Sequence, residues 1–269
     1  MDTLSIGPLA IPLDRLFVLL GVVGVFALAW WLERRRGVDA GLPLWCGLIA
    51  GIVVGRAAYA SARWDWYQDN PVTVLFFWQE GYAPVWGMAA ALLVAALVAW
   101  RRQIPVLVPS ASLLAGFALW GALAFGHGLV SDGPAGSLPE RQLTSLEGER
   151  LELAGLEGKP VVINLWASWC PPCRREMPAF EQAQARYGDE VHFLFPNQGE
   201  SREEMEAWLA AEGLELDGVL LDKSSSLSGE VGAHVLPTTL FYDADGKLRD
   251  AHVGEVSSAR LADYVESLK

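Results

Sequence analysis

The sequence predicts an α-helical membrane domain, with about four transmembrane helices, followed by an α/β domain. Three observations predict this order: long apolar stretches fill the first half, charged residues gather in the second, and a strand–helix–strand pattern there surrounds a cysteine pair. Up to Val130 the chain carries eight Arg, no Lys and seven acidic residues, whereas the rest carries twelve basic and twenty-five acidic residues. We expect a membrane anchor over residues 1–130, a linker over 131–139 and an acidic domain over 140–269, whose charge argues against nucleic-acid binding.

Four apolar stretches are long enough to cross a bilayer as helices, which takes about 20 residues. The segment before the first carries Asp2 and Asp14 against a single Arg15. A cleaved signal peptide would begin with net positive charge, so we do not expect one here. The predicted spans are Leu16–Leu32, Leu42–Ala62, Tyr82–Trp100 and Ile104–Phe125.

Clusters of arginine follow the first and third spans, at residues 34–36 and 101–102. Because cytoplasmic loops are enriched in Lys and Arg, both clusters are expected on the inner side of the membrane. The N-terminus and the acidic domain are then expected outside. The apolar run at 72–78 is too short to cross, so we expect it at the interface or as a re-entrant segment.

Two side chains of the second span are unusual. Arg56 is costly in a bilayer, so it either serves a function or is accommodated by snorkelling or pairing. The candidate partners are Asp65, Asp69 and Glu80. Cys46 is expected to be a small buried hydrophobe, as free cysteines usually are. Electron transfer across a membrane by dithiol exchange would need a cysteine pair, and this half has only one cysteine.

The strongest chemical signal is the pentapeptide Trp-Cys-Pro-Pro-Cys at residues 169–173. An apolar run at 161–165 predicts a buried strand before it, and the two prolines suit the first turn of a helix. Cys170 is thus expected at a helix N-terminus, where free N–H groups lower a thiol pKa from about 8.5 toward 7. Cys173, one turn inside, is close enough to form a disulfide. This pattern predicts a redox pair in which Cys170 is the nucleophile and Cys173 resolves.

Two other interpretations of the cysteine pair are weaker. A zinc site needs four ligands at suitable spacing, but no cysteine follows Cys173 and the later histidines, at 192, 234 and 252, are scattered. A purely structural disulfide would close a loop too short to restrict much of the unfolded chain. The redox interpretation is therefore preferred.

The acidic domain has the element order of a compact α/β fold. A strand, a helix and a strand around the cysteines form a βαβ unit. Ser201 and Glu204 form a capping box that opens a helix to about Ala211, and the turn at 243–246 predicts a hairpin. The expected strands are 142–146, 150–153, 161–167, 191–195, 219–221, 238–242 and 247–253, and the expected helices are 172–187, 201–211 and 257–268.

Residues 138–269 resemble the thioredoxin-fold domain of TlpA-like, membrane-tethered disulfide reductases. The resemblance rests on residues 169–173 with Glu-Met-Pro at 176–178, on Asn-Gln-Gly-Glu at 197–200 and on Leu-Pro-Thr-Thr at 236–239. It implies a cis Leu236–Pro237 bond beside the cysteines, with the backbone of Leu236 pairing with the substrate chain. It also implies that Trp169 shields Cys170. The expected substrate-binding residues are Trp169, Pro171, Leu236 and Pro237.

Asn164 occupies the position where cytosolic thioredoxins have a buried aspartate that moves the proton of the resolving cysteine. An asparagine cannot take up that proton. Glu176 lies three residues after Cys173, on the same helix face. A buried carboxylate there can act as the acid and base, so Glu176 is a candidate catalytic residue. The alternative is a solvent-exposed glutamate in the first helical turn, favoured by the helix dipole.

The first half resembles part of prolipoprotein diacylglyceryl transferase over about residues 40–126. The similar segments are 51–59, 70–71 and 77–81. The segment at 83–87 lacks the histidine of that family, and 116–121 lacks its Gly-Arg-x-Gly-Asn-Phe signature. The resemblance implies a degenerate relative that serves as an anchor or docking surface, without transferase activity.

These observations predict an enzyme, a thiol:disulfide oxidoreductase of the bacterial inner membrane with its redox domain on the periplasmic side. It is expected to reduce disulfides of envelope proteins, without a cofactor or metal, and to receive electrons from a membrane donor of the DsbD type. Two alternatives stay open. The first alternative is an oxidase of the same fold. The second is a lipid-binding or docking module with an ancillary redox domain.

Overall fold

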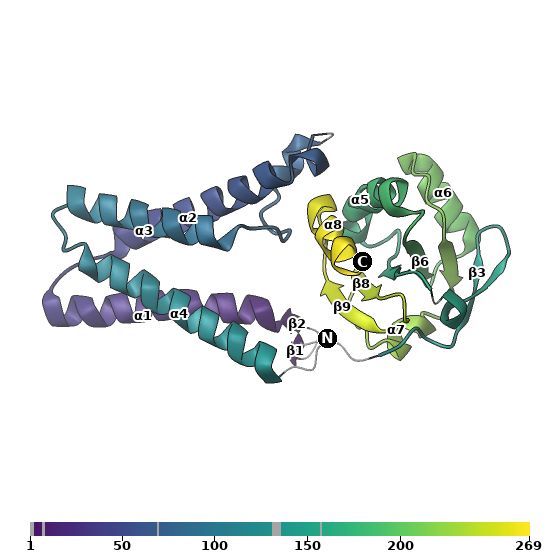
Figure 1. Cartoon of the computed structure of the whole chain (residues 1–269), viewed down its shortest axis with the longest axis horizontal. Helices are drawn as coiled ribbons and strands as arrows, with labels where there is room; N and C mark the ends of the chain where they lie inside the picture. The colour runs from purple at the N-terminus through teal and green to yellow at the C-terminus, as the bar shows by residue number, and fades with distance from the viewer. Residues whose placement is uncertain (1–2, 7–8, 69, 131–135, 157) are drawn as a thin grey trace. The chain divides into compact units, whose positions relative to one another are not determined.

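The structure is a computed structural model that describes the chain except residues 1–2, 7–8, 69, 131–135 and 157 (Figure 1). The chain divides between Asp132 and Gly133 into two compact units. Each unit is described by itself below. Most of the linker expected at 131–139 lies outside the described residues.

The first unit contains four long helices at the positions of the four predicted spans. All four are long and apolar enough to cross a membrane. A short antiparallel hairpin of β1 (Thr3–Ile6) and β2 (Leu9–Pro12) precedes them, which the sequence analysis did not predict. The helices are α1 (Leu13–Arg36), α2 (Gly41–Ala62), α3 (Pro84–Arg101) and α4 (Leu107–Val130).

Small residues allow α2 and α3 to approach closely. A Cβ atom on Gly47 would lie 2.7 Å from the carbonyl oxygen of Ala91, and one on Gly51 would lie 2.9 Å from that of Gly87. Larger side chains at these two positions would force the backbones apart. Glycine and alanine are typical of helix contacts inside membranes, where packing replaces the hydrophobic effect as the driving force.

Arg56 organises the connection between α2 and α3. This connection contains the 3₁₀ turns η1 (Trp64–Trp66) and η2 (Pro71–Leu75), at the position of the predicted interfacial run. Arg56 is only 5% exposed, so it does not snorkel. Its guanidinium donates to the backbone carbonyls of Thr73 (3.1 Å), Val74 (3.0 Å), Phe76 (3.5 Å), Glu80 (2.9 Å) and Gly81 (2.9 Å). The arginine thus adds a donor to carbonyls of a connection that is mostly not helical, although the Thr73 and Phe76 carbonyls also accept the N–H groups of Phe76 and Gln79. Buried backbone carbonyls need such partners, above all in an apolar environment.

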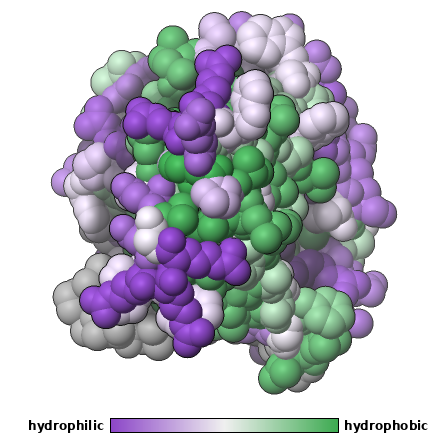
Figure 2. All heavy atoms as spheres, turned by 90° about the vertical axis from the view of Figure 1, so that its left-hand side faces the viewer, coloured by the Kyte–Doolittle hydropathy of each residue, from purple (hydrophilic) through white to green (hydrophobic). Residues whose placement is uncertain are grey.

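Arginine residues gather at the end of the helical unit where α1 and α3 end. Figure 2 shows this end, where hydrophilic residues lie in patches beside apolar ones. The last turn of α1 contributes Arg34, Arg35 and Arg36, and the last turn of α3 contributes Arg101. The guanidinium of Arg34 lies 3.9 Å from the centre of the Trp30 ring. Both predicted arginine clusters therefore lie at the same end of the helical unit.

The second unit is built on a seven-stranded sheet in the order β4-β3-β7-β6-β5-β8-β9. The central strands β5, β6 and β7 are parallel, and β3 and β8 pair antiparallel to them. Every residue of β5 is buried, as expected for a central strand covered on both faces. The strands are β3 (Gln142–Ser145), β4 (Arg150–Glu152), β5 (Val161–Leu165), β6 (His192–Gln198), β7 (Val219–Asp222), β8 (Thr238–Tyr242) and β9 (Leu248–Val253).

The helices follow the sequence prediction closely, with two short elements omitted. The capping box between Ser201 and Glu204 is present, and the parallel pairing of β5 with β6 confirms the βαβ unit. The 3₁₀ turn η3 (Leu153–Leu156) and the short α7 were not predicted. The helices are α5 (Pro171–Tyr187), α6 (Arg202–Glu212), α7 (Ser226–Glu230) and α8 (Ser258–Ser267).

Candidate active site

The cysteine pair lies where the chain leaves β5 and enters α5. Cys170 is the N-cap of α5 and forms a disulfide with Cys173, with 5.3 Å between their Cα atoms. Pro171 and Pro172 have no N–H group, so the first free N–H of the helix is that of Cys173. This N–H points at the sulfur of Cys170, at 3.4 Å. In the reduced state the same N–H and the helix dipole would stabilise a Cys170 thiolate.

The expected substrate-binding residues lie beside this pair in the chain or at the end of the sheet from which its loop starts. Trp169 is 65% exposed, and Pro171 is also exposed. The Leu236–Pro237 bond is cis, as the resemblance implied. Leu165, the last residue of β5, pairs with Thr238, the first residue of β8. Pro237 therefore lies at the same end of the sheet as the start of the loop to Cys170. The structure therefore brings the Cys-Pro-Pro-Cys segment and the Leu236–Pro237 segment to the same end of the sheet.

Glu176 is buried one turn after Cys173. Its carboxyl is 1% exposed and accepts two hydrogen bonds. Asn164 Nδ2 donates to Oε1 at 2.8 Å, and the Val256 N–H donates to Oε2 at 3.0 Å. Burial outweighs these bonds and raises the pKa of Glu176 to about 8. The exposed first-turn glutamate that the sequence left open is therefore wrong.

Asn164 links Glu176 to the neighbouring strand. Its Nδ2 also donates to Thr239 Oγ1 at 3.1 Å, and Asn164 and Thr239 lie opposite each other in the β5–β8 register. Among the residues that the structure describes, Asn164 Oδ1 has no hydrogen-bond partner. A buried acceptor in that condition costs roughly 1–3 kcal/mol.

A second buried carboxylate holds the loop that leads to Cys170. Glu200 Oε2 accepts the Ser168 N–H at 2.7 Å and Asn197 Nδ2 at 2.6 Å, while Oε1 accepts the Ser168 hydroxyl. The Asn-Gln-Gly-Glu segment at 197–200 is part of the resemblance described above, which implied no role for it. Its signal was the position of this segment at the end of β6, beside the end of β5.

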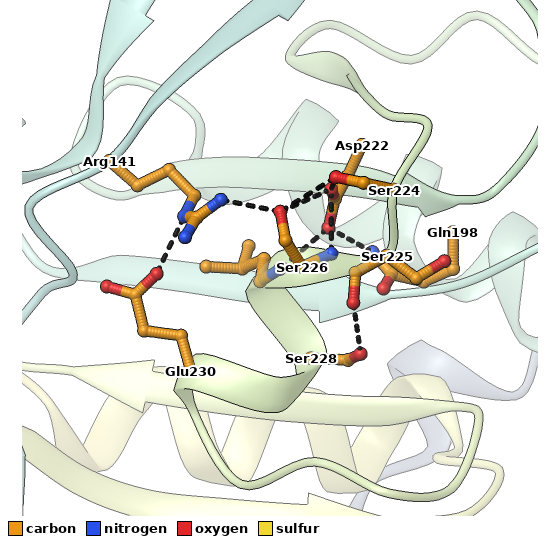
Figure 3. A network of polar contacts seen from close by, with 9 residues as sticks. Arg141, Gln198, Asp222, Ser224, Ser225, Ser226, Ser228 and Glu230 are labelled. Carbon is orange, nitrogen blue, oxygen red and sulfur yellow. Dashed lines mark hydrogen bonds and ion pairs between the residues drawn. The ribbon is translucent and has the colours of Figure 1, made fainter.

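A polar network fixes the segment that leads to Pro237 (Figure 3). Asp222, at the end of β7, is 3% exposed and accepts the N–H groups of Ser226 (3.0 Å) and Leu227 (2.9 Å) at the start of α7. Arg141 reaches from before β3 to Glu230 at the other end of α7, at 2.6 Å. Both ends of this short helix are therefore tied to the sheet, which limits the movement of the chain that follows.

The two arginines after the cysteines are in ion pairs. Arg174 lies 2.6 Å from Glu212, and Arg175 lies 2.6 Å from Glu255. The side chain of Glu255 is only 4% exposed, so that carboxylate compensates much of the positive charge of Arg175 next to the active site. Within the described part of the chain, no group of three or more His, Cys, Asp or Glu residues could hold a metal ion.

A thioredoxin-like sheet, a disulfide at a helix N-terminus and a cis-proline at the same sheet edge define the class of thioredoxin-fold thiol-disulfide oxidoreductases. The comparisons with known proteins agree. The profile of the AhpC/TSA family matches residues 134–251. Thiol-disulfide oxidoreductase ResA of Bacillus thuringiensis is 31% identical over 131 residues, which cover 48% of this chain and 75% of ResA. The chain therefore belongs to the family of ResA-type thiol-disulfide oxidoreductases, and its residues 134–251 match the AhpC/TSA profile.

Two further proteins are similar to this chain. Thioredoxin-like protein YneN of Bacillus subtilis is 32% identical over 126 residues, covering 46% of this chain and 73% of YneN. The crystal structure of the exposed lipoprotein thioredoxin Etrx1 of Streptococcus pneumoniae is 26% identical. It covers 48% of this chain and 100% of that chain, with a TM-score of 0.42.

Proposed function

We propose that the chain is a membrane-anchored reductase of protein disulfides, with Cys170 as nucleophile, Cys173 as resolving cysteine and Glu176 as acid and base. The observation that supports this most is the position of Cys170. Its sulfur meets the first free N–H of α5, and its partner Cys173 is buried one turn before the buried Glu176. Trp169, Pro171, Leu236 and Pro237 would contact the substrate chain.

The reaction needs no bound cofactor, because the sulfur pair carries the electrons. The Cys170 thiolate attacks a substrate disulfide, forms a mixed disulfide and releases one substrate sulfur as a thiolate, which takes a proton from water. Cys173 then loses its proton and attacks Cys170 Sγ. The Cys170–Cys173 bond forms, the mixed disulfide breaks, and the second substrate sulfur leaves. Two electrons have then passed to the substrate, which is reduced.

Glu176 would serve the second step. Cys173 is fully buried, so water is a poor acceptor for its proton. The ionised carboxylate of Glu176 can accept that proton. A pKa of about 8 lies close to the usual thiol value of about 8.5, so the transfer is nearly balanced in energy.

The direction of electron flow follows from how little the thiolate is stabilised. Pro171 and Pro172 supply neither charge nor N–H, and Arg174 and Arg175 are engaged by carboxylates. We expect a reduction potential nearer that of thioredoxin, about −270 mV, than that of a strong oxidant, about −120 mV. The Cys173 N–H opposes this, so a more positive potential would favour an oxidase.

We further propose that the helical unit, residues 1–130, anchors the enzyme in the inner membrane, with residues 140–269 on the periplasmic side. The support is the four long apolar helices and the arginine clusters at one end. Cys46 is the single cysteine of this unit, so a separate membrane donor of the DsbD type would keep the pair reduced. The helical unit would be a degenerate transferase relative that contacts lipid without transferring it.

The test is to trap partners in cells. A Cys173→Ser chain cannot resolve, so it should accumulate mixed disulfides with envelope proteins through Cys170. A Cys170→Ser, Cys173→Ser double variant is the matched control. The in-cell redox state of the wild-type pair is measured alongside. A mainly oxidised pair, with a potential above about −150 mV, would replace the reductase by the oxidase. If the Cys173→Ser chain forms no more mixed disulfides than the double variant, the proposal is contradicted.

A further inference from the structure

Asn164 carries a buried polar atom that the reaction above leaves unused. The residue has no exposed surface, and its Nδ2 donates to both Glu176 Oε1 and Thr239 Oγ1. Within the described residues its Oδ1 meets no donor. Buried polar atoms are nearly always paired, so an unpaired one needs an explanation. Here it means that nothing on the Oδ1 side fixes the orientation of the amide. Among the described residues, its hydrogen bonds to Glu176 and Thr239 alone decide it.

The two oxygens of the Glu176 carboxyl differ in what a proton would meet. A proton on Oε2 would face the Val256 N–H, which is also a donor. A proton on Oε1 would face Asn164 Nδ2, again a donor, in the orientation described. That orientation therefore suits the ionised carboxylate. With its pKa raised to about 8 by burial, Glu176 is mostly protonated at neutral pH, and its O–H then needs an acceptor.

A half rotation of the Asn164 amide about its Cβ–Cγ bond supplies that acceptor. Oδ1 then takes the place of Nδ2 and faces Glu176 Oε1. It also faces the hydroxyl of Thr239, which can donate as readily as it accepts. Both contacts persist after the rotation with their direction reversed. Nδ2 becomes the unpaired atom instead, so one polar atom of the amide is unpaired in either state.

We propose that Asn164 is a positioning residue whose amide turns with the proton of Glu176, donating to the carboxylate and accepting from the carboxylic acid. This rests on the proposed acid–base role of Glu176. An aspartate at this position would repel the ionised carboxylate. Asparagine holds the Glu176 side chain in one place in both states without carrying a charge of its own, so the carboxyl stays in place for Cys173 while its proton comes and goes.

Other titratable groups also influence Glu176. They are the same in every variant below, so differences between variants report on the amide. The charges of Arg175 and Glu255 act on the carboxyl in opposite directions. Among the described residues, the titratable groups on the elements around this site are Cys170 and Cys173 at the start of α5, Arg175 on α5, Glu255 after β9, His252 on β9 opposite Thr239, and Tyr264 on α8 beside His252.

The first test follows the amide itself, in the oxidised full-length protein in detergent. The chain has only three asparagines, so ¹³C at asparagine Cγ gives few infrared bands, and an Asn164→Ser chain identifies the band of Asn164. As the pH rises through the titration of Glu176, the Asn164 carbonyl should lose its donors and its band should move to higher wavenumber. The bands of the other two asparagines should stay. An Asn164 band that stays fixed while the carboxylic-acid band of Glu176 disappears would overturn the proposal.

The second test uses the pH profile of disulfide exchange between the reduced full-length protein and oxidised glutathione. Asn164→Asp places a second carboxyl beside Glu176, so the midpoint should rise by about one pH unit or more. Thr239→Val removes one partner of the amide and should move the midpoint, while Thr239→Ser restores it. Thr238→Val is the matched control, because the hydroxyl of Thr238 bonds the Val235 carbonyl instead. Equal midpoints for the two valine variants would contradict the proposal, even if the aspartate variant does not fold.

Glu176→Gln separates the two proposals. If this variant keeps the wild-type rate and profile, the acid–base role of Glu176 fails, whatever the amide does. If it lowers the rate and removes the pH step while the Asn164 band in the wild type stays fixed, only the role of Asn164 fails.

Discussion

Arg56 in the helical unit and Glu176 in the redox unit are both buried ionisable groups, but their partners differ in kind. Arg56 faces five backbone carbonyls, which only accept hydrogen bonds. A guanidinium only donates, so this environment suits a single protonation state. Glu176 faces one backbone N–H and one amide that can donate or accept. Burial alone does not mark a catalytic group. A group that exchanges protons needs at least one partner that tolerates both of its states.

The comparison predicts that Arg56 matters for stability rather than for chemistry. Arg56→Leu removes the arginine donors from five carbonyls of residues 73–81, of which only those of Thr73 and Phe76 also accept a backbone N–H among the described contacts. The detergent-solubilised protein should therefore lose about 3 kcal/mol of stability. Arg56→Lys keeps the charge but has only three donors, so its stability should lie between that of the wild type and that of Arg56→Leu. Aggregation temperature measures this, with the exposed Arg102→Leu as control. Loss of disulfide exchange in a stable Arg56→Leu protein would break the comparison.

Glu176 should make the stability of the redox unit depend on pH. Its folded pKa, about 8, lies above its ordinary value of 4.5. Between these values the folded protein holds a proton that the unfolded chain has lost. The contribution of Glu176 to the free energy of unfolding should therefore be greatest below about pH 4.5. It should fall by about 1.4 kcal/mol per pH unit as the pH rises toward 8. Denaturant unfolding of the oxidised wild type against Glu176→Gln measures it, because the glutamine removes this slope. Parallel pH dependences of the two proteins would contradict it.

The sequence predicted the redox unit well because its signals are local. The prolines place Cys170 at a helix start, Ser201 and Glu204 cap α6, and the short apolar run of β5 favours a buried strand. Position in the chain also placed Glu176 on the face of Cys173. Residue type and spacing carry these features, so they can be predicted without a structure.

Other contacts could not be read from the sequence, for physical reasons. The partners of Arg56 are backbone carbonyls, which every residue has, so the candidate carboxylates were the only visible choice. The bond from Ser168 to Glu200 joins residues 32 apart and depends on the register of β5 and β6. The amide of Asn164 could be excluded as a base, but its contact with Thr239 depends on the β5–β8 register. The helix α7 has five residues, too few for a periodic pattern.

Glu200 provides the finest test of the comparison, because its partners resemble those of Arg56 more than those of Glu176. Two of its three donors are fixed. One is the backbone N–H of Ser168, and the other is the Asn197 amide, which is held in one orientation because its Oδ1 accepts the Glu200 N–H at 3.3 Å; the third donor, the Ser168 hydroxyl, can reverse. A glutamine can direct its oxygen to the two N–H groups and its NH₂ to that hydroxyl. Glu200→Gln should therefore cost less than about 1 kcal/mol, whereas Glu200→Ala leaves two buried donors unpaired and should cost roughly 1–3 kcal/mol.

Neither substitution at Glu200 should move the midpoint of the pH profile of disulfide exchange, because Glu200 holds the loop before Cys170 and handles no proton in the proposed reaction. Denaturant unfolding and the exchange rate with oxidised glutathione measure the two effects on the same protein samples. A midpoint that shifts in Glu200→Gln while stability is unchanged would show that this carboxylate shares the proton chemistry of Glu176. The distinction between fixed and reversible partners would then be wrong for carboxylates, although it would still describe Arg56.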